Sequence, residues 1–185
     1  GAWYSVGIHP WSIEKTYRGA VVEYPLWEKL VEDVQHPQVL AVGEAGIDKL
    51  ADVPIALQED FFREQARLAS DMGKPLVIHA VRATDELLRL KKELRPQNAW
   101  IIHGFRGKAA LAEEYLRHGF HLSFGERYQE EALLVTPQER LFMETDESRV
   151  PIGSLYERAA LVRNISVESL RRSVADNVGR VFFRS

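Results

Sequence analysis

Short apolar segments alternate with amphipathic segments along the whole chain, and this alternation predicts a β-α-β-α order. The apolar segments do not alternate with polar residues internally, which is typical of strands that are covered on both faces. We expect six strands, over residues 3–8, 39–44, 75–80, 100–105, 120–125 and 140–146.

The segments between these strands carry helical periodicity. Residues 56–72 place apolar side chains on one helical face, namely Leu57, Phe61, Leu68 and Met72. Gly73 then fits the left-handed position after a helix end, and Pro75 blocks continuation. Further helices are expected after an N-cap at Thr84, over 108–118, over 153–164, and after an N-cap at Ser166.

The β-α-β-α order implies a parallel sheet, either doubly wound or closed as a barrel. A doubly wound sheet gathers its ligand at one switch point and often carries a glycine-rich phosphate turn. The sequence contains no G-x-G-x-x-G motif and no P-loop.

Ionisable residues instead follow several strands at their carboxyl ends. In a parallel barrel all of these ends open on one mouth, so the side chains would converge. This convergence favours a TIM-type (β/α)8 barrel. The residues are His9, Glu44, Asp48, His79, His103, Glu144 and Asp146.

The length of 185 residues fits a single domain over 1–185. A net charge of −3 gives no global electrostatic case for nucleic acid or anionic membranes, although a local metal site can still bind phosphate. The absence of cysteine excludes disulfides and thiolate metal ligands and is compatible with the cytoplasm, the location we expect. No apolar run approaches the length of a membrane span, and no obligate protein partner is indicated.

The strand-end residues Glu44, His79, His103 and Asp146 have the donor types that suit Zn²⁺, Mn²⁺, Mg²⁺ or Fe²⁺. Such a site can hydrolyse a phosphoester, because divalent metals polarise phosphoryl oxygens and activate water. Other strand-end residues have two readings each. His9 contacts substrate or shapes a turn, and Asp48 joins the site or caps the next segment.

Arg82 and Arg106 follow the two ligand histidines, and they hold phosphate or are solvated loop residues. His36, His118 and His121 have no such placement, so we interpret them as structural. On these grounds His9, Arg82 and Arg106 are the predicted substrate-binding residues.

Seven motifs occur in an order that resembles the TatD family of metal-dependent deoxyribonucleases, within the amidohydrolase-type barrels. They are "GIHPW", "VGEAGID", "Q…F…Q…LA…GKPLVIH", "IIHGFRG", "GFHLSFG", "RLFMETDES" and the terminal "NVGRVF". The resemblance covers residues 3–183. It implies that Glu44 bridges two divalent metals, that His79 and His103 hold one of them, and that Asp146 binds metal or activates the attacking water.

The same resemblance implies one or two divalent cofactors (Mg²⁺, Mn²⁺ or Zn²⁺), with Glu44 and Asp146 as catalytic residues. It also implies a DNA substrate, single-stranded or offering 3′ ends, and possible action as a 3′-5′ exonuclease. Alternatives are an amidohydrolase-type hydrolase of a small phosphoester, lactone or amide, and an inactive metal-binding homologue.

The sequence departs from the family pattern at its first strand. Family members end that strand with an H-x-H pair, and no H-x-H occurs here. Six strands are visible where a barrel needs eight. We therefore expect two further strands upstream of Gly1, with a divergent one-metal member as the alternative. Arg82 also lies one position away from the family's H-S-R arginine.

Overall fold

The structure is a computed structural model that describes residues 1–15 and 25–183. Its contacts divide the chain into two compact units, Gly1–Trp100 and Ile101–Ser185. Each unit is described by itself, and the expectation of a single domain over 1–185 stays a prediction. Within the described residues, no helix is both long enough and apolar enough to cross a membrane.

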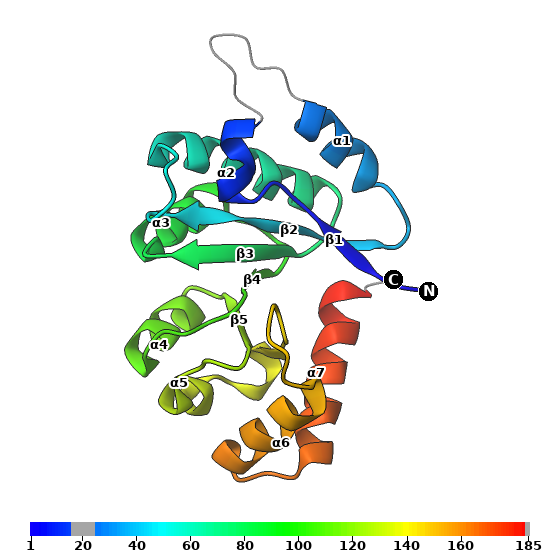
Figure 1. Cartoon of the computed structure of the whole chain (residues 1–185), viewed down its shortest axis with the longest axis vertical. Helices are drawn as coiled ribbons and strands as arrows, with labels where there is room; N and C mark the ends of the chain where they lie inside the picture. The colour runs from blue at the N-terminus through cyan, green and yellow to red at the C-terminus, as the bar shows by residue number, and fades with distance from the viewer. Residues whose placement is uncertain (16–24, 184–185) are drawn as a thin grey trace. The chain divides into compact units, whose positions relative to one another are not determined.

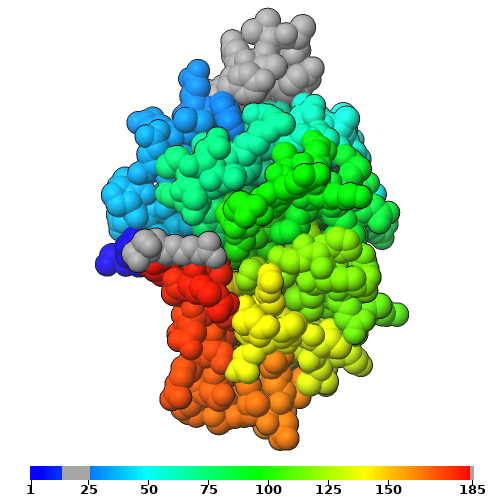
Figure 2. All heavy atoms as spheres, turned by 180° about the vertical axis from the view of Figure 1, so that it is seen from behind, coloured from blue at the N-terminus to red at the C-terminus, as the bar shows by residue number. Residues whose placement is uncertain are grey.

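The first unit is built on three parallel strands in the order β1-β2-β3, side by side in Figure 1. They are β1 (Tyr4–Val6), β2 (Val39–Asp48) and β3 (Leu76–Val81). Figure 2 shows α2 and α3 (teal to green) covering one face of this unit. The helices are η1 (Pro10–Lys15), α1 (Pro25–Asp33), α2 (Ile55–Asp71) and α3 (Thr84–Leu94).

The second unit repeats the pattern with shorter strands. Parallel pairing joins β4 to β5 and β5 to β6. The strands are β4 (Trp100–Ile102, which begins at the boundary), β5 (His121–Phe124) and β6 (Leu141–Met143). The helices are α4 (Ala109–Arg117), α5 (Glu130–Val135), η2 (Gln138–Arg140), α6 (Ile152–Arg163) and α7 (Val167–Phe182).

The six expected strands are all present, and their ends differ from expectation. β2 continues to Asp48 because its last residues pair with β3 beyond the predicted end. Ser166 is confirmed as the N-cap of α7, since its hydroxyl accepts from the Ser169 N–H. The predicted N-cap at Thr84 is wrong: Ala83 holds the cap position, and Thr84 is the first helical residue.

Two buried glutamines of α2 hold the ends of β1 and β2. The Gln65 amide accepts from the Ile8 N–H at 2.7 Å and donates to the Ile8 carbonyl at 3.1 Å. Gln58 makes the same pair of bonds with Asp48, at 2.7 and 3.0 Å, and also donates to the Val53 carbonyl. These bonds satisfy the backbone groups of Asp48, at the end of β2, and of Ile8, just after β1, so the segments leaving both strands have fixed positions.

Glycines permit a close approach between β2 and β3. A Cβ atom at Gly46 would lie 1.9 Å from the His79 carbonyl oxygen. At Gly43, where φ is +151°, a Cβ would lie 2.6 Å from the Val77 carbonyl oxygen. Only glycine allows the two backbones to come this close, and the approach brings Glu44 beside β3.

Replacement of Gly46 by alanine should destabilise the first unit by about 3 kcal/mol or more, because the clash involves backbone atoms that cannot move aside. Chemical denaturation measures this loss. Gly179→Ala in α7 is the matched control, because nothing lies within 4 Å of its added Cβ. The control should be neutral or stabilising by up to about 1 kcal/mol. Equal behaviour of the two variants would contradict the assigned close approach.

An ion pair links the end of β2 to the first turn of α3. Lys49 Nζ lies 2.6 Å from Glu86 Oε1. Burial by itself would raise the pKa of Glu86, but the hydrogen bond and charge of Lys49 outweigh it and lower the pKa below its usual 4.5. Because the folded-state pKa is the lower one, this contribution is present above about pH 4.5 and is lost as the pH falls through the folded value.

Glu86→Gln should therefore make the free energy of unfolding less sensitive to acid below about pH 4.5. Urea denaturation at pH 3 to 7 checks this. Glu113→Gln, at an exposed position of α4, is the control and should follow the wild-type pH curve. A Glu86→Gln curve parallel to that of the wild type would sink the assignment.

Candidate metal and phosphate-binding site

Three candidate ligands from neighbouring strands of the first unit lie close together. His9 follows β1, Glu44 lies in β2 and His79 lies in β3. Glu44 Oε2 is 3.7 Å from His9 Nε2 and 3.9 Å from His79 Nδ1. One donor atom from each residue lies within 4.8 Å of the other two.

A bulge in β2 positions Glu44. Val42 pairs with Leu76 and Ala45 pairs with Ile78, so three steps along β2 match two steps along β3. The extra residue falls at Gly43–Glu44. Bulges of this kind redirect a side chain next to functional sites, and here the redirected side chain is the predicted bridging carboxylate.

Asp48 orients His79 from behind. Its Oδ2 lies 3.1 Å from His79 Nε2 and accepts from the Trp11 indole N–H at 2.8 Å, while Oδ1 accepts from the Leu50 N–H at 2.8 Å. Burial by itself would raise the pKa of Asp48, but the bonds from His79, Leu50 and Trp11 outweigh it and lower the pKa. The ionised carboxylate therefore favours a proton on His79 Nε2. The unprotonated Nδ1, on the side of Glu44, then offers its lone pair to a metal ion.

The second unit holds a separate cluster after β4 and β6. His103 Nδ1 lies 3.2 Å from Glu144 Oε1, and Asp146 joins them with all three donor atoms within 4.8 Å of one another. Asp146 has φ +49°, a conformation that few residues other than glycine, Asn and Asp adopt. Sparsely populated backbone conformations of this kind cluster at functional sites.

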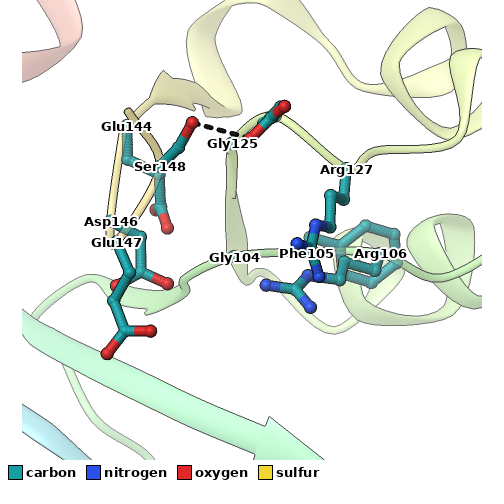
Figure 3. Close-up of a pocket in the computed structure, with 10 residues that line it drawn as sticks. Gly104, Phe105, Arg106, Gly125, Arg127, Glu144, Asp146, Glu147 and Ser148 are labelled. Atoms are coloured by element: carbon teal, nitrogen blue, oxygen red, sulfur yellow. Dashed lines mark hydrogen bonds between the residues drawn. The ribbon is translucent and has the colours of Figure 1, made fainter. Parts of the chain in front are cut away.

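A hollow of about 180 Å³ opens beside this second cluster. Figure 3 shows the carboxylates of Asp146 and Glu147 on one side of it, and the guanidinium groups of Arg106 and Arg127 on the other. Ser148 donates to Glu126 at 2.7 Å across the loops that follow β5 and β6. Paired arginines can hold phosphate oxygens through several charge-assisted hydrogen bonds.

The predicted site residues thus fall into two groups. Glu44 and His79 lie together in the first unit with His9, and His103 and Asp146 lie together in the second with Arg106 nearby. Arg82 is exposed and directly follows β3, with φ +53°. The complete ligand set of Glu44, His79, His103 and Asp146 stays a prediction.

The structure adds residues that the sequence did not assign. Glu144 faces His103, Arg127 lines the hollow, and Trp11 shares the Asp48 carboxylate with His79. Two of the histidines expected to be structural make local contacts: His36 accepts from the Gln38 N–H, and His118 lies 2.8 Å from the Glu114 carbonyl. The third, His121, is buried against the Phe142 ring.

The donor sets fit a divalent cation. When ligand atoms surround a tetrahedral metal ion at metal–ligand distances of about 2.0–2.2 Å, neighbouring ligand atoms are about 3.3–3.6 Å from one another. The separations of 3.7 and 3.9 Å in the first cluster are close to this spacing and too long for hydrogen bonds. Imidazole and carboxylate donors without thiolates suit Zn²⁺ and Mn²⁺, and the carboxylates also suit Mg²⁺.

Comparison with known proteins decides the family. The model of the TatD-related DNase family matches residues 1–183. The chain belongs to this family. The family resemblance drawn from the seven motifs is therefore confirmed.

Two relatives illustrate the relationship to the TatD family. The chain is 35% identical over 169 residues to an uncharacterized metal-dependent hydrolase, YabD, of Bacillus subtilis, with 80% of this chain and 66% of the relative covered. It is 29% identical over 174 residues to the 3′-5′ ssDNA/RNA exonuclease TatD of Klebsiella pneumoniae, covering 89% of this chain and 64% of that protein. The chain thus spans about two thirds of the length of these relatives.

The fold is shared with a solved TatD homologue, YjjV of Escherichia coli. The TM-score is 0.82 at 20% sequence identity, and the match covers 99% of this chain and 77% of that one. The predicted fold class, a TIM-type α/β barrel of the TatD kind, is confirmed by this likeness.

Replacement of Asp48 by asparagine should lower the affinity for Mn²⁺ or Zn²⁺ by about 10- to 100-fold, because His79 loses the carboxylate that sets its tautomer and orientation. Isothermal titration calorimetry of the metal-free protein measures the change. Asp52→Asn removes an exposed carboxylate four residues away and should leave the affinity unchanged. Wild-type affinity in Asp48→Asn would show that Asp48 does not support a metal ligand.

Proposed function

We propose that this protein is a metal-dependent phosphodiesterase that removes nucleotides from the 3′ ends of single-stranded nucleic acid. The observation that carries the proposal is the pair of histidine–carboxylate clusters at the carboxyl ends of parallel strands, one in each unit. The name of the Klebsiella pneumoniae relative, a 3′-5′ ssDNA/RNA exonuclease, supports the choice of substrate and polarity.

The first cluster supplies the Glu44 carboxylate and the His79 imidazole as cation ligands. Asp48 supports the ligand role of His79, and the bulge in β2 supports that of Glu44. A bound divalent cation would supply a Lewis acid for the phosphoryl oxygens and would lower the pKa of nearby water.

The second cluster supplies the proton acceptor and the phosphate contacts. Asp146 is exposed at the hollow, where a carboxylate can bind a cation or take a proton from water. Arg106 faces it across the hollow and would neutralise the phosphate charge. Glu144 lies against His103 and would orient that imidazole.

The remaining roles belong to the same proposal. His9 lies within reach of Glu44, so it acts as a further cation ligand or as a substrate contact. Arg82 contacts the substrate backbone from the end of β3. The protein works in the cytoplasm, without an obligate protein partner.

An end-labelled single-stranded oligonucleotide tests this function in the presence of Mg²⁺ or Mn²⁺. The full-length gene product should shorten the oligonucleotide from its 3′ end, and EDTA should stop the reaction. Asp146→Asn should lower kcat by about 100-fold or more, because the residue loses its capacity to accept a proton.

Asp176→Asn, at an exposed position of α7, is the matched control and should retain wild-type kcat. Metal binding without any shortening of DNA or RNA would defeat the proposal and favour a hydrolase of small phosphoesters, lactones or amides. Equal kcat in Asp146→Asn and Asp176→Asn would remove Asp146 from the chemistry.

A further inference from the structure

Trp11 is a large apolar side chain in an unexpected environment. It is 64% exposed, yet it lies beside the polar first cluster. Its indole ring is 4.8 Å from the His9 ring and 5.8 Å from the His79 ring, centre to centre, and meets both edge-on. The ring supplies no metal ligand, and only its N–H serves the site, through the bond to Asp48.

We propose that Trp11 is the stacking platform for one unpaired nucleobase of the substrate, in the nucleotide at or next to the cleaved bond. This inference rests on the proposed function, because it assigns part of the substrate to a surface of that same site. Indole is well suited to the task, since every base has a π-face and stacking is tolerant of sequence.

The platform is held in place before any substrate binds. The indole N–H donates to Asp48 Oδ2 at 2.8 Å, and Asp48 is only 3% exposed and is itself held by the Leu50 N–H. A side chain fixed in this way loses little conformational freedom on binding. The same carboxylate holds His79, so the ring and the candidate metal ligand share one anchor.

The surface next to Trp11 has the chemistry of a base subsite. Together with neighbouring residues the ring borders a hollow of about 510 Å³, a size typical of small-ligand sites. Apolar side chains contribute most of this lining, and the charged groups in it are acidic. The residues used here are Trp11, Leu50, Val53, Val81, Asp48 and Asp52.

This lining excludes phosphate and favours an uncharged flat group. Two carboxylates would repel a phosphate, and the described residues that line the hollow include no Lys or Arg to attract one. Leu50 is also 64% exposed, which adds apolar surface beside the ring. The second unit's hollow differs in that Arg106 and Arg127 line it together with its carboxylates, and these guanidinium groups can bind phosphate oxygens.

A set of fluorescein-labelled single-stranded oligonucleotides tests the platform. Each oligonucleotide lacks the base at one position, and this abasic position differs from one oligonucleotide to the next. Binding to the full-length protein is measured by fluorescence anisotropy in EDTA, which stops metal-dependent cleavage, so the readout does not require hydrolysis. Removal of the base at one position should weaken wild-type binding by about 5- to 100-fold.

Trp11→Leu and Trp11→Phe form the matched pair. Both lose the indole N–H bond to Asp48, but only Phe keeps an aromatic face. Trp11→Leu should lose the penalty for the abasic site at that position, and Trp11→Phe should keep most of it. Trp3→Leu is the control, because Trp3 is 55% exposed and precedes β1, whereas Trp11 follows that strand.

Four results of the binding assay would overturn the inference. They are wild-type binding that is indifferent to every abasic site, no wild-type binding at all, a wild-type penalty in Trp11→Leu, and equal loss of the penalty in Trp11→Leu and Trp11→Phe. The last result would assign the effect to the Asp48 bond rather than to stacking.

Cleavage of the same oligonucleotides with Mn²⁺ separates this inference from the function. Base-dependent binding without cleavage would defeat the proposed nuclease and support the platform. Cleavage whose kcat/KM is the same in Trp11→Leu and in the wild type would defeat the platform and support the nuclease.

Discussion

The geometry of the first cluster depends on hydrogen bonds from one helix to two strand ends. Gln58 and Gln65 lie seven residues apart on α2, so both amides project from the same face of the helix. Each amide bonds both the N–H and the carbonyl of a single residue, either Asp48 at the end of β2 or Ile8 shortly after β1. The helix α2 therefore positions two parts of the first cluster. One is the segment that carries His9 and Trp11, and the other is the Asp48 carboxylate that bonds His79.

The sequence was sufficient for the order of the six strands and of the helices α2, α3, α4, α6 and α7, because buried parallel strands and amphipathic helices have distinct patterns, but it did not indicate α1 or α5. It also placed His103 correctly, directly after β4, but Glu44 lies inside β2, which continues to Asp48. Thr84 shows the limit of such reasoning. Its side chain is a good cap in general, but α3 begins one residue earlier, with Ala83 at the cap position.

Contacts between distant segments were beyond sequence reasoning. The bond from Trp11 to Asp48 joins residues 37 positions apart, and the contact of His103 with Glu144 joins residues 41 apart. Neither has a local pattern. Glu144 was visible as a strand-end carboxylate, but its contact with His103 depends on the positions of β4 and β6 in the sheet. Asp48 was expected to serve as a cap or a site residue, and its carboxylate does bond the Leu50 N–H while also holding His79.

The Gln58 amide also bears on how the protein would age chemically. Its nitrogen donates to the carbonyls of Asp48 and Val53, and its oxygen accepts from the Asp48 N–H. Deamidation would replace that nitrogen with a carboxylate oxygen and turn both donor contacts into repulsions. Burial in α2 shields the amide from water in the folded state. Repeated heating that unfolds α2 would therefore allow Gln58 to deamidate. The resulting carboxylate would remain at the end of β2 after the chain has refolded.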